Sequence, residues 1–120
     1  MPVRAIRGAV QVDGNNRELI LEGAADLVKE VIARNGLTHE DFISIIFTAT
    51  PDLTADFPAY AARQMGLTDV PLLCSTEIDV PGAMPRVLRL LAHVELDVPR
   101  AKIHHVYLRG AAALRTDLPQ

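Results

Sequence analysis

The sequence contains little cysteine, few aromatic residues and no tryptophan. Cys74 is the single cysteine in 120 residues, which excludes an internal disulfide framework and a cysteine-based zinc site. Aromatic residues make up 4% of the chain, so we expect a core of aliphatic side chains. No apolar run approaches the length of a membrane span, and the segment MPVRAIRGAV lacks the apolar stretch of a signal peptide. We therefore expect a cytoplasmic protein that does not associate with a membrane.

The chain also lacks an excess of basic residues. Twelve lysines and arginines stand against 15 acidic residues, for a net charge of −3. Because nucleic-acid binding depends on a basic field, nucleic acid is not expected as the main partner, although a local cationic pocket stays possible. The sequence has no phosphate-binding glycine-rich loop, no Ser-His-Asp signature and no metal-ligand spacing. We expect no cofactor and no metal.

The length fits a single domain over residues 1–120. The segment 87–96 is compatible with a helix or a strand, and we favour a strand because polar and apolar residues alternate along its second half. The order β-α-β-α-β-β-β predicts an α+β fold with helices packed on one face of a mixed sheet. We expect strands at 3–12, 42–49, 71–75, 87–96 and 103–108, helices at about 17–35 and 59–65, and short helical turns at 38–41 and 98–102.

Three local patterns refine this prediction. The run FISIIFTA at 42–49 is nearly all apolar, which is typical of a strand covered on both faces. The turn at 13–16 supplies a helix N-cap, and Gly36 is suited to the helix C-terminus. His104 and His105 are neighbours in the last predicted strand, so they would point to opposite faces and could not share one metal. The tail from residue 111 onward shows little periodicity.

Two arginines stand in otherwise apolar predicted strands. Arg89 interrupts VLRLLAHV, and because a buried guanidinium without a partner is costly, it must meet an anion or reach water. The spacing is equally compatible with a ligand site and with a structural alternative, either an ion pair, for example with Glu77, or an exposed strand end. Arg7 lies between Ala5 and Ala9 on one strand face, where small neighbours leave room for a ligand, and a plain surface arginine is its alternative. Because arginine binds carboxylates bidentately, the pair favours a dicarboxylate ligand.

Four further residues carry weaker signals. Arg63 lies on the second predicted helix, where most arginines are solvated. Glu77 follows a short strand, and strand ends often carry functional groups, although most loop carboxylates are simply hydrated. Tyr107 needs a hydrogen-bond partner if its hydroxyl is buried, with core packing as the default interpretation. Cys74 is best interpreted as a small buried hydrophobe, since no flanking motif supports a nucleophile. Cations, one carboxylate and a phenol favour binding and electrostatic stabilisation over covalent or redox chemistry.

Five segments of the sequence together resemble one known family. They are IRGA at 6–9, TATPDLTADFPAYAAR at 48–63, VPLLCSTEIDVPG at 70–82, RVLRLLAHV at 86–94 and HHVYLRGAAALR at 104–115. The sequence is similar to the trimeric α/β class of monofunctional chorismate mutases. That family converts chorismate, a dicarboxylate with an ether bridge, to prephenate by a Claisen rearrangement in phenylalanine and tyrosine biosynthesis. The resemblance implies a homotrimeric isomerase that needs no cofactor and has an active site at each subunit interface.

The resemblance also implies roles for individual residues. Arg89 would contact the ether oxygen and a carboxylate, and Glu77 would accept a hydrogen bond from the ring hydroxyl. Arg7 and Tyr107 would hold a carboxylate, and Arg115 in the tail would close over the entrance. Arg89, Glu77 and Arg7 are therefore the expected catalytic residues.

A second group of residues is implied to complete the substrate site. Leu73 and Cys74 would line the pocket, partly through backbone groups, while Phe57 and Arg63 would come from the neighbouring subunit. Tyr60 departs from the family pattern, in which a charged residue is common at this position.

Two other functions stay open at this level. Trimeric imine or enamine deaminases have a related topology and also hold a carboxylate with an arginine. A non-catalytic module that binds a carboxylate metabolite would need the same arginines. The set of Arg7, Glu77, Arg89 and Tyr107 favours the mutase over both.

Overall fold

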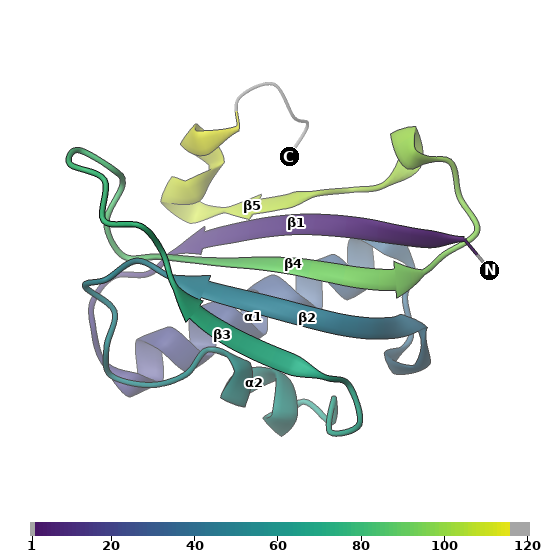
Figure 1. Ribbon diagram of the computed structural model, residues 1–120, viewed down its shortest axis with the longest axis horizontal. Coiled ribbons are helices and arrows are strands. Elements are labelled where there is room, and N and C mark those ends of the chain that lie inside the picture. Colours follow the sequence, from purple (N-terminus) through teal and green to yellow (C-terminus); the bar gives the residue numbers. More distant parts are fainter. Residues whose placement is uncertain (1, 116–120) are drawn as a thin grey trace.

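Residues 2–115 are described by the computed structural model, and they form a five-stranded mixed sheet with its two α-helices on one face (Figure 1). This arrangement and the order of the main elements confirm the predicted fold, including the choice of a strand for 87–96. The strands are β1 (Val3–Gln11), β2 (Phe42–Ala49), β3 (Leu72–Thr76), β4 (Val87–Glu95) and β5 (Val106–Leu108). The α-helices are α1 (Arg17–Asn35) and α2 (Ala59–Gln64), and three short 3₁₀ helices are η1 (His39–Asp41), η2 (Arg100–Lys102) and η3 (Arg109–Leu114).

The strand order in the sheet is β3-β2-β4-β1-β5. Strand β4 runs antiparallel to both of its neighbours, β1 and β2, whereas β3 and β5 add to the two edges as parallel strands. The register places Arg89 of β4 between Ala9 of β1 and Thr48 of β2. Arg89 therefore lies on the middle strand of the sheet, where side chains from both neighbouring strands can reach it.

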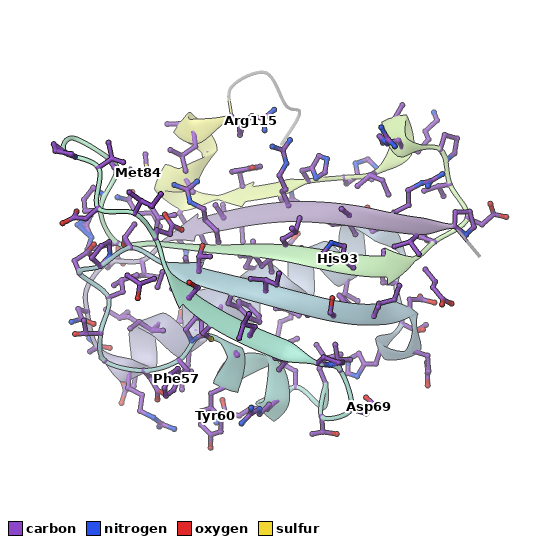
Figure 2. All side chains as sticks on the ribbon, viewed as in Figure 1. Phe57, Tyr60, Asp69, Met84, His93 and Arg115 are labelled. Carbon is purple, nitrogen blue, oxygen red and sulfur yellow. The ribbon has the colours of Figure 1, made fainter. Side chains whose placement is uncertain are left out.

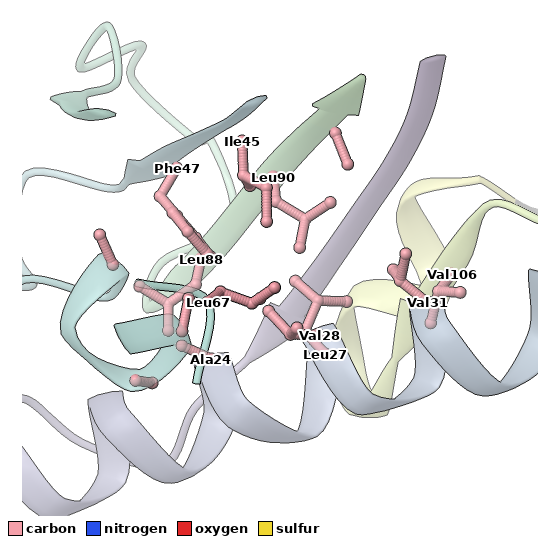
Figure 3. Packing of buried hydrophobic residues seen from close by; sticks show 14 of the residues in the cluster. Ala24, Leu27, Val28, Val31, Ile45, Phe47, Leu67, Leu88, Leu90 and Val106 are labelled. Carbon is pink, nitrogen blue, oxygen red and sulfur yellow. The ribbon is translucent and has the colours of Figure 1, made fainter. Parts of the chain in front are cut away.

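Helix α1 begins and ends at the predicted residues. The Asn16 side chain accepts a hydrogen bond from the backbone N–H of Leu19 at 2.9 Å, which caps the N-terminus. Gly36 ends the helix in the left-handed conformation with φ of 63°, which glycine adopts without steric cost. Between these caps, α1 packs its apolar stripe onto the sheet, mainly against β1 and β5 and also against β4 (Figure 3). This aliphatic core contains Ala24, Leu27, Val28 and Val31 from α1, Ile45 and Phe47 from β2, and Leu88 and Leu90 from β4.

The opposite face of the sheet is largely uncovered. In β2, the side chains of Ile45 and Phe47 are buried toward the helices, while Ser44, Ile46 and Thr48, which alternate with them on the other face, are only partly buried. The prediction that β2 is covered on both faces is therefore not met within one chain. One corner of this open face is covered by η3, where Ala111 packs with Tyr107 and the residues beside it. A single chain thus leaves apolar surface exposed on this face of the sheet, apart from the corner that η3 covers.

The structure corrects two predictions near the C-terminus. Strand β5 begins at Val106 rather than at residue 103, so His104 and His105 lie before the strand and not on it. The backbone N–H and C=O of His104 bond the Asn35 side chain at 2.9 Å each, which removes them from pairing with β1. The tail also contains η3, which the weak periodicity did not predict. No helix within residues 2–115 is long and apolar enough to cross a membrane.

Candidate active site

A cavity of about 490 Å³ lies on the open face of the sheet. We call it the central cavity. It brings together three of the residues that the sequence singled out, from three different strands: Arg7 of β1, Arg89 of β4 and Tyr107 of β5. Its lining residues are Arg7, Gly8, Ile46, Thr48, Arg89, Leu90, Leu91, Tyr107, Leu114 and Arg115. Three arginines and a phenol set among aliphatic side chains fit a small anionic ligand with an apolar ring.

Arg89 and Glu77 form an ion pair at the side of this cavity. The Arg89 Nε donates to Glu77 Oε2 at 2.9 Å, and the Thr48 hydroxyl donates to the same oxygen at 2.6 Å. The ion-pair alternative for Arg89 is thus present, but it coexists with a ligand site. Within residues 2–115, Nε is the guanidinium nitrogen that bonds a protein group, and the two terminal nitrogens bond none. The Arg89 side chain is 38% exposed and that of Glu77 is 17% exposed, so the arginine faces the open cavity.

Arg7 presents its guanidinium to the central cavity from β1. Among the described residues, this guanidinium makes no hydrogen bond or ion pair with a protein group, so its charge is available to an anion. Its backbone N–H donates to His105 Nδ1 at 3.0 Å. Burial, followed by the positive charges of Arg7 and Arg115, lowers the pKa of His105. A neutral His105 can accept this hydrogen bond, whereas a protonated ring cannot.

Tyr107 connects the central cavity to the C-terminal segment. Its ring is buried on the open face, in a small cluster with Ala9, Val87 and Ala111. The backbone turns sharply after β5, at Arg109 with φ of 56°, and η3 then leads to residues 114 and 115 on the cavity wall. Residues 114 and 115 therefore line the central cavity, and closure of the tail over the entrance stays a prediction.

The remaining predicted residues line a different cavity of about 310 Å³, between α2 and β3. We call it the edge cavity, and its lining residues are Phe57, Ala59, Tyr60, Arg63, Leu72, Leu73 and Cys74. Phe57 is 69% exposed and Leu73 is 61% exposed, which is unusual for large apolar side chains. Desolvation raises the pKa of the Cys74 thiol above its ordinary value, which favours a neutral wall residue over a thiolate nucleophile.

The two cavities lie toward opposite edges of the sheet. Figure 2 shows Phe57 and Tyr60 beside α2 below β3, whereas Arg115 lies beyond β5. The edge cavity draws its lining from α2, β3 and the segment before α2, and the central cavity from β1, β2, β4, β5 and the tail. One chain therefore does not bring all the predicted site residues together. It brings together two groups that face different directions.

The segment that carries Phe57 is held by contacts that the sequence did not indicate. The Asn15 side-chain carbonyl accepts hydrogen bonds from the backbone N–H groups of Thr54 at 2.9 Å and Ala55 at 3.0 Å. Arg17 pairs with Asp56 at 2.7 Å, and its guanidinium lies 5.3 Å from the centre of the Tyr60 ring. A positive charge is therefore present beside Tyr60, although the residue itself is neutral.

Sequence reasoning missed Thr48 and His105 as parts of the site. Thr48 belongs to an apolar strand and has no distinctive sequence neighbours. Only the sheet register, which is not encoded locally, places it opposite Arg89. For His105, the sequence indicated only that it and His104 could not share one metal, whereas in the structure its ring accepts a hydrogen bond from the backbone of β1.

Comparison with known proteins agrees with this architecture. The protein-family model for chorismate mutase type I matches residues 3–118. Chorismate mutase AroH of Thermus thermophilus is 46% identical over 117 residues, which cover 97% of this chain and 96% of that protein. The AroH chorismate mutase of Bacillus subtilis (strain 168) is 40% identical over 119 residues, covering 98% and 94%. A solved chorismate mutase from Clostridium thermocellum superposes with a TM-score of 0.90 at 49% identity, covering 91% of this chain and 97% of that one. The chain belongs to the type I chorismate mutase family.

Proposed function

We propose that this protein converts chorismate to prephenate at sites formed between the subunits of a homotrimer. The central cavity of one subunit would supply Arg7, Glu77, Arg89 and Tyr107, and the edge cavity of its neighbour would supply the rest. The observation that carries the proposal is the pair of guanidinium groups on the open face, whose terminal nitrogens have no protein partner within residues 2–115. Family membership favours the mutase over a deaminase or a binding module.

The incompleteness of each half-site supports an assembly of several subunits. The edge cavity contains Phe57, Arg63, Leu73 and Cys74, and the central cavity contains none of them. A contact that joins two different surfaces of the same chain is heterologous, and it closes into a ring when the rotation allows. The family resemblance gives three subunits for that ring. In this proposal one domain over residues 1–120 forms each subunit, and the enzyme acts in the cytoplasm.

The reaction is unimolecular, so the protein accelerates it by holding a reactive conformation and by stabilising charge. Arg7 and Tyr107 would clamp a carboxylate, which holds the enolpyruvyl arm over the ring and restricts its torsions. The neighbour's Phe57 would exclude water from the apolar side of the ring, and its Arg63 would add a cation. These contacts act in the ground state and in the transition state alike.

Charge stabilisation falls to Arg89. As the carbon–oxygen bond of the ether stretches, the oxygen becomes more negative, and a fixed guanidinium nearby lowers the energy of that state. Because Glu77 holds Arg89 through Nε, both terminal nitrogens can point into the central cavity. The Glu77 oxygen that is not used by this pair would accept a hydrogen bond from the ring hydroxyl, which fixes the orientation of the ring.

Mixing two variants tests the shared site directly. Arg89→Ala removes the central half-site and Arg63→Ala removes the edge half-site, so each homotrimer should turn over chorismate slowly. The two variants are unfolded and refolded together at equal concentration, so that their subunits mix. Each half-site is then intact in about half of the subunits, and about a quarter of the sites should have two intact halves. Activity is followed by the loss of chorismate absorbance in the ultraviolet. No gain over the separate variants would show that one subunit contains the whole site.

A further inference from the structure

Thr48 lies at the centre of the charged group on the open face. In the register of the sheet, Thr48 of β2 is opposite Arg89 of β4 on one side and Ser75 of β3 on the other. Glu77 follows β3, and its backbone N–H donates to the carbonyl of Ala49 at 2.9 Å. The Thr48 side chain therefore stands between the strand that carries the cation and the segment that carries the carboxylate.

The hydroxyl of Thr48 determines how the Glu77 carboxylate is used. Oε2 receives two hydrogen bonds, from Thr48 Oγ1 at 2.6 Å and from Arg89 Nε at 2.9 Å. Within residues 2–115, Oε1 receives none. The two oxygens of one carboxylate thus have different tasks: Oε2 is saturated by the protein, and Oε1 stays available as an acceptor.

Without the Thr48 hydroxyl, no rigid side chain would hold the ion pair of Glu77 and Arg89 in place. Glutamate and arginine side chains both have many rotamers, and ordering such side chains costs conformational entropy. Threonine is β-branched and has a restricted χ1, and here it sits on a strand whose backbone is paired on both sides. It is the stiffest of the three side chains, so it can hold the position of the other two.

We propose that Thr48 is a positioning residue that fixes Glu77 and, through it, Arg89 in the geometry needed for catalysis. This inference rests on the proposed chorismate mutase activity. Thr48 acts on the substrate through the two charged groups: its donor keeps Oε2 on the arginine side and turns Oε1 toward the cavity. It thereby keeps the terminal nitrogens of Arg89 aimed at the reacting oxygen.

The test compares Thr48→Val with Thr48→Ser. Valine has nearly the same shape but no hydroxyl, whereas serine keeps the donor on a less restricted side chain. Thr48→Val removes a hydrogen bond to a charged group that supports the transition state. We therefore expect kcat to decrease roughly 10- to 100-fold. KM for chorismate should change far less, because the carboxylate clamp of Arg7 and Tyr107 is untouched. Thr48→Ser should recover most of the lost kcat.

Thr50→Val is the matched control. Its hydroxyl accepts a hydrogen bond from the backbone N–H of Val87 at 3.1 Å, so the substitution removes a buried hydroxyl without touching Glu77. We expect it to lower the thermal midpoint while kcat stays near the parental value. If Thr48→Val does not fold, Thr48→Ala provides the same comparison.

A double-mutant cycle shows whether Thr48 acts through the carboxylate. In a Glu77→Gln background, Thr48→Val should have little further effect on kcat, because the group it positions is already altered. Equal effects in both backgrounds, or a Thr48→Val enzyme with parental kcat, would overturn the inference while leaving the proposed function intact. A parental protein that does not turn over chorismate would instead overturn the proposed function.

Discussion

Replacing Arg89 by lysine keeps the positive charge but removes the branched guanidinium. In the structure, Arg89 satisfies Glu77 through Nε at 2.9 Å and directs its terminal nitrogens to the central cavity. A lysine has a single terminal nitrogen on a flexible stem. It can remain with Glu77 or reach the ligand, and it cannot do both in the same geometry.

The expected loss follows from the bonds that lysine cannot make. Two charge-assisted hydrogen bonds from the terminal nitrogens, each worth about 1.5–3 kcal/mol, are absent if the lysine stays with Glu77. The barrier then rises by about 3–6 kcal/mol, which lowers kcat/KM by roughly 10²- to 10⁴-fold. Because the ether oxygen gains charge mainly in the transition state, most of this loss should appear in kcat.

The assay follows the decrease in chorismate absorbance with purified Arg89→Lys and parental enzymes at matched concentration. Arg4→Lys is the control: Arg4 also lies on a strand and donates through Nε, to the carbonyl of Val98 at 2.8 Å, but it does not line the central cavity. It should retain parental kinetics. An Arg89→Lys enzyme with parental kcat/KM would refute the role of the guanidinium fork, since charge alone would then be sufficient.

Three further substitutions test other parts of the structure. Glu77→Ala should keep the fold and lower kcat/KM by roughly 10- to 100-fold, measured by steady-state kinetics beside circular dichroism; unchanged kinetics would contradict its role. Gly23→Ala places a Cβ atom 2.5 Å from Val12 Cγ1, and urea unfolding should show a net loss of about 1–3 kcal/mol despite the better helix propensity of alanine. The pKa of His105 is lowered in the folded protein. As the pH falls, His105 therefore takes up a proton in the unfolded chain first, near the ordinary histidine pKa of 6.5. Stability should therefore fall as the pH drops below about 6.5, and His105→Gln, which also weakens the contact to Arg7, should flatten this part of the curve in thermal unfolding.

The secondary structure was predictable because its determinants are local. The cap at Asn16 and the left-handed Gly36 set the ends of α1 through contacts within a few residues. Strand β4 was predictable because polar and apolar residues alternate along its second half, which is a pattern of strands and not of helices. The start of β5 was not predictable, because the Asn35 side chain bonds the backbone of His104 from 69 positions away and takes it out of the sheet.

The site was predictable only in part, for a related reason. Arg89 drew attention because a guanidinium is costly in an apolar strand, and its partner Glu77 could be guessed from charge alone. Thr48 carries no such signal, since threonine is common in strands and its hydroxyl is easily satisfied. Its importance depends on the pairing of β2 with both β3 and β4, which is a property of the whole sheet.

One prediction that a single chain does not meet, the coverage of β2, bears on assembly. The sequence of β2 predicts a strand covered on both faces, and the chain covers one. The uncovered face holds the central cavity, and the exposed Phe57 and Leu73 belong to the edge cavity. If a second subunit docks as proposed, the same contact buries these apolar side chains and completes the site. Stability and activity should then depend on protein concentration together, because both are properties of the interface.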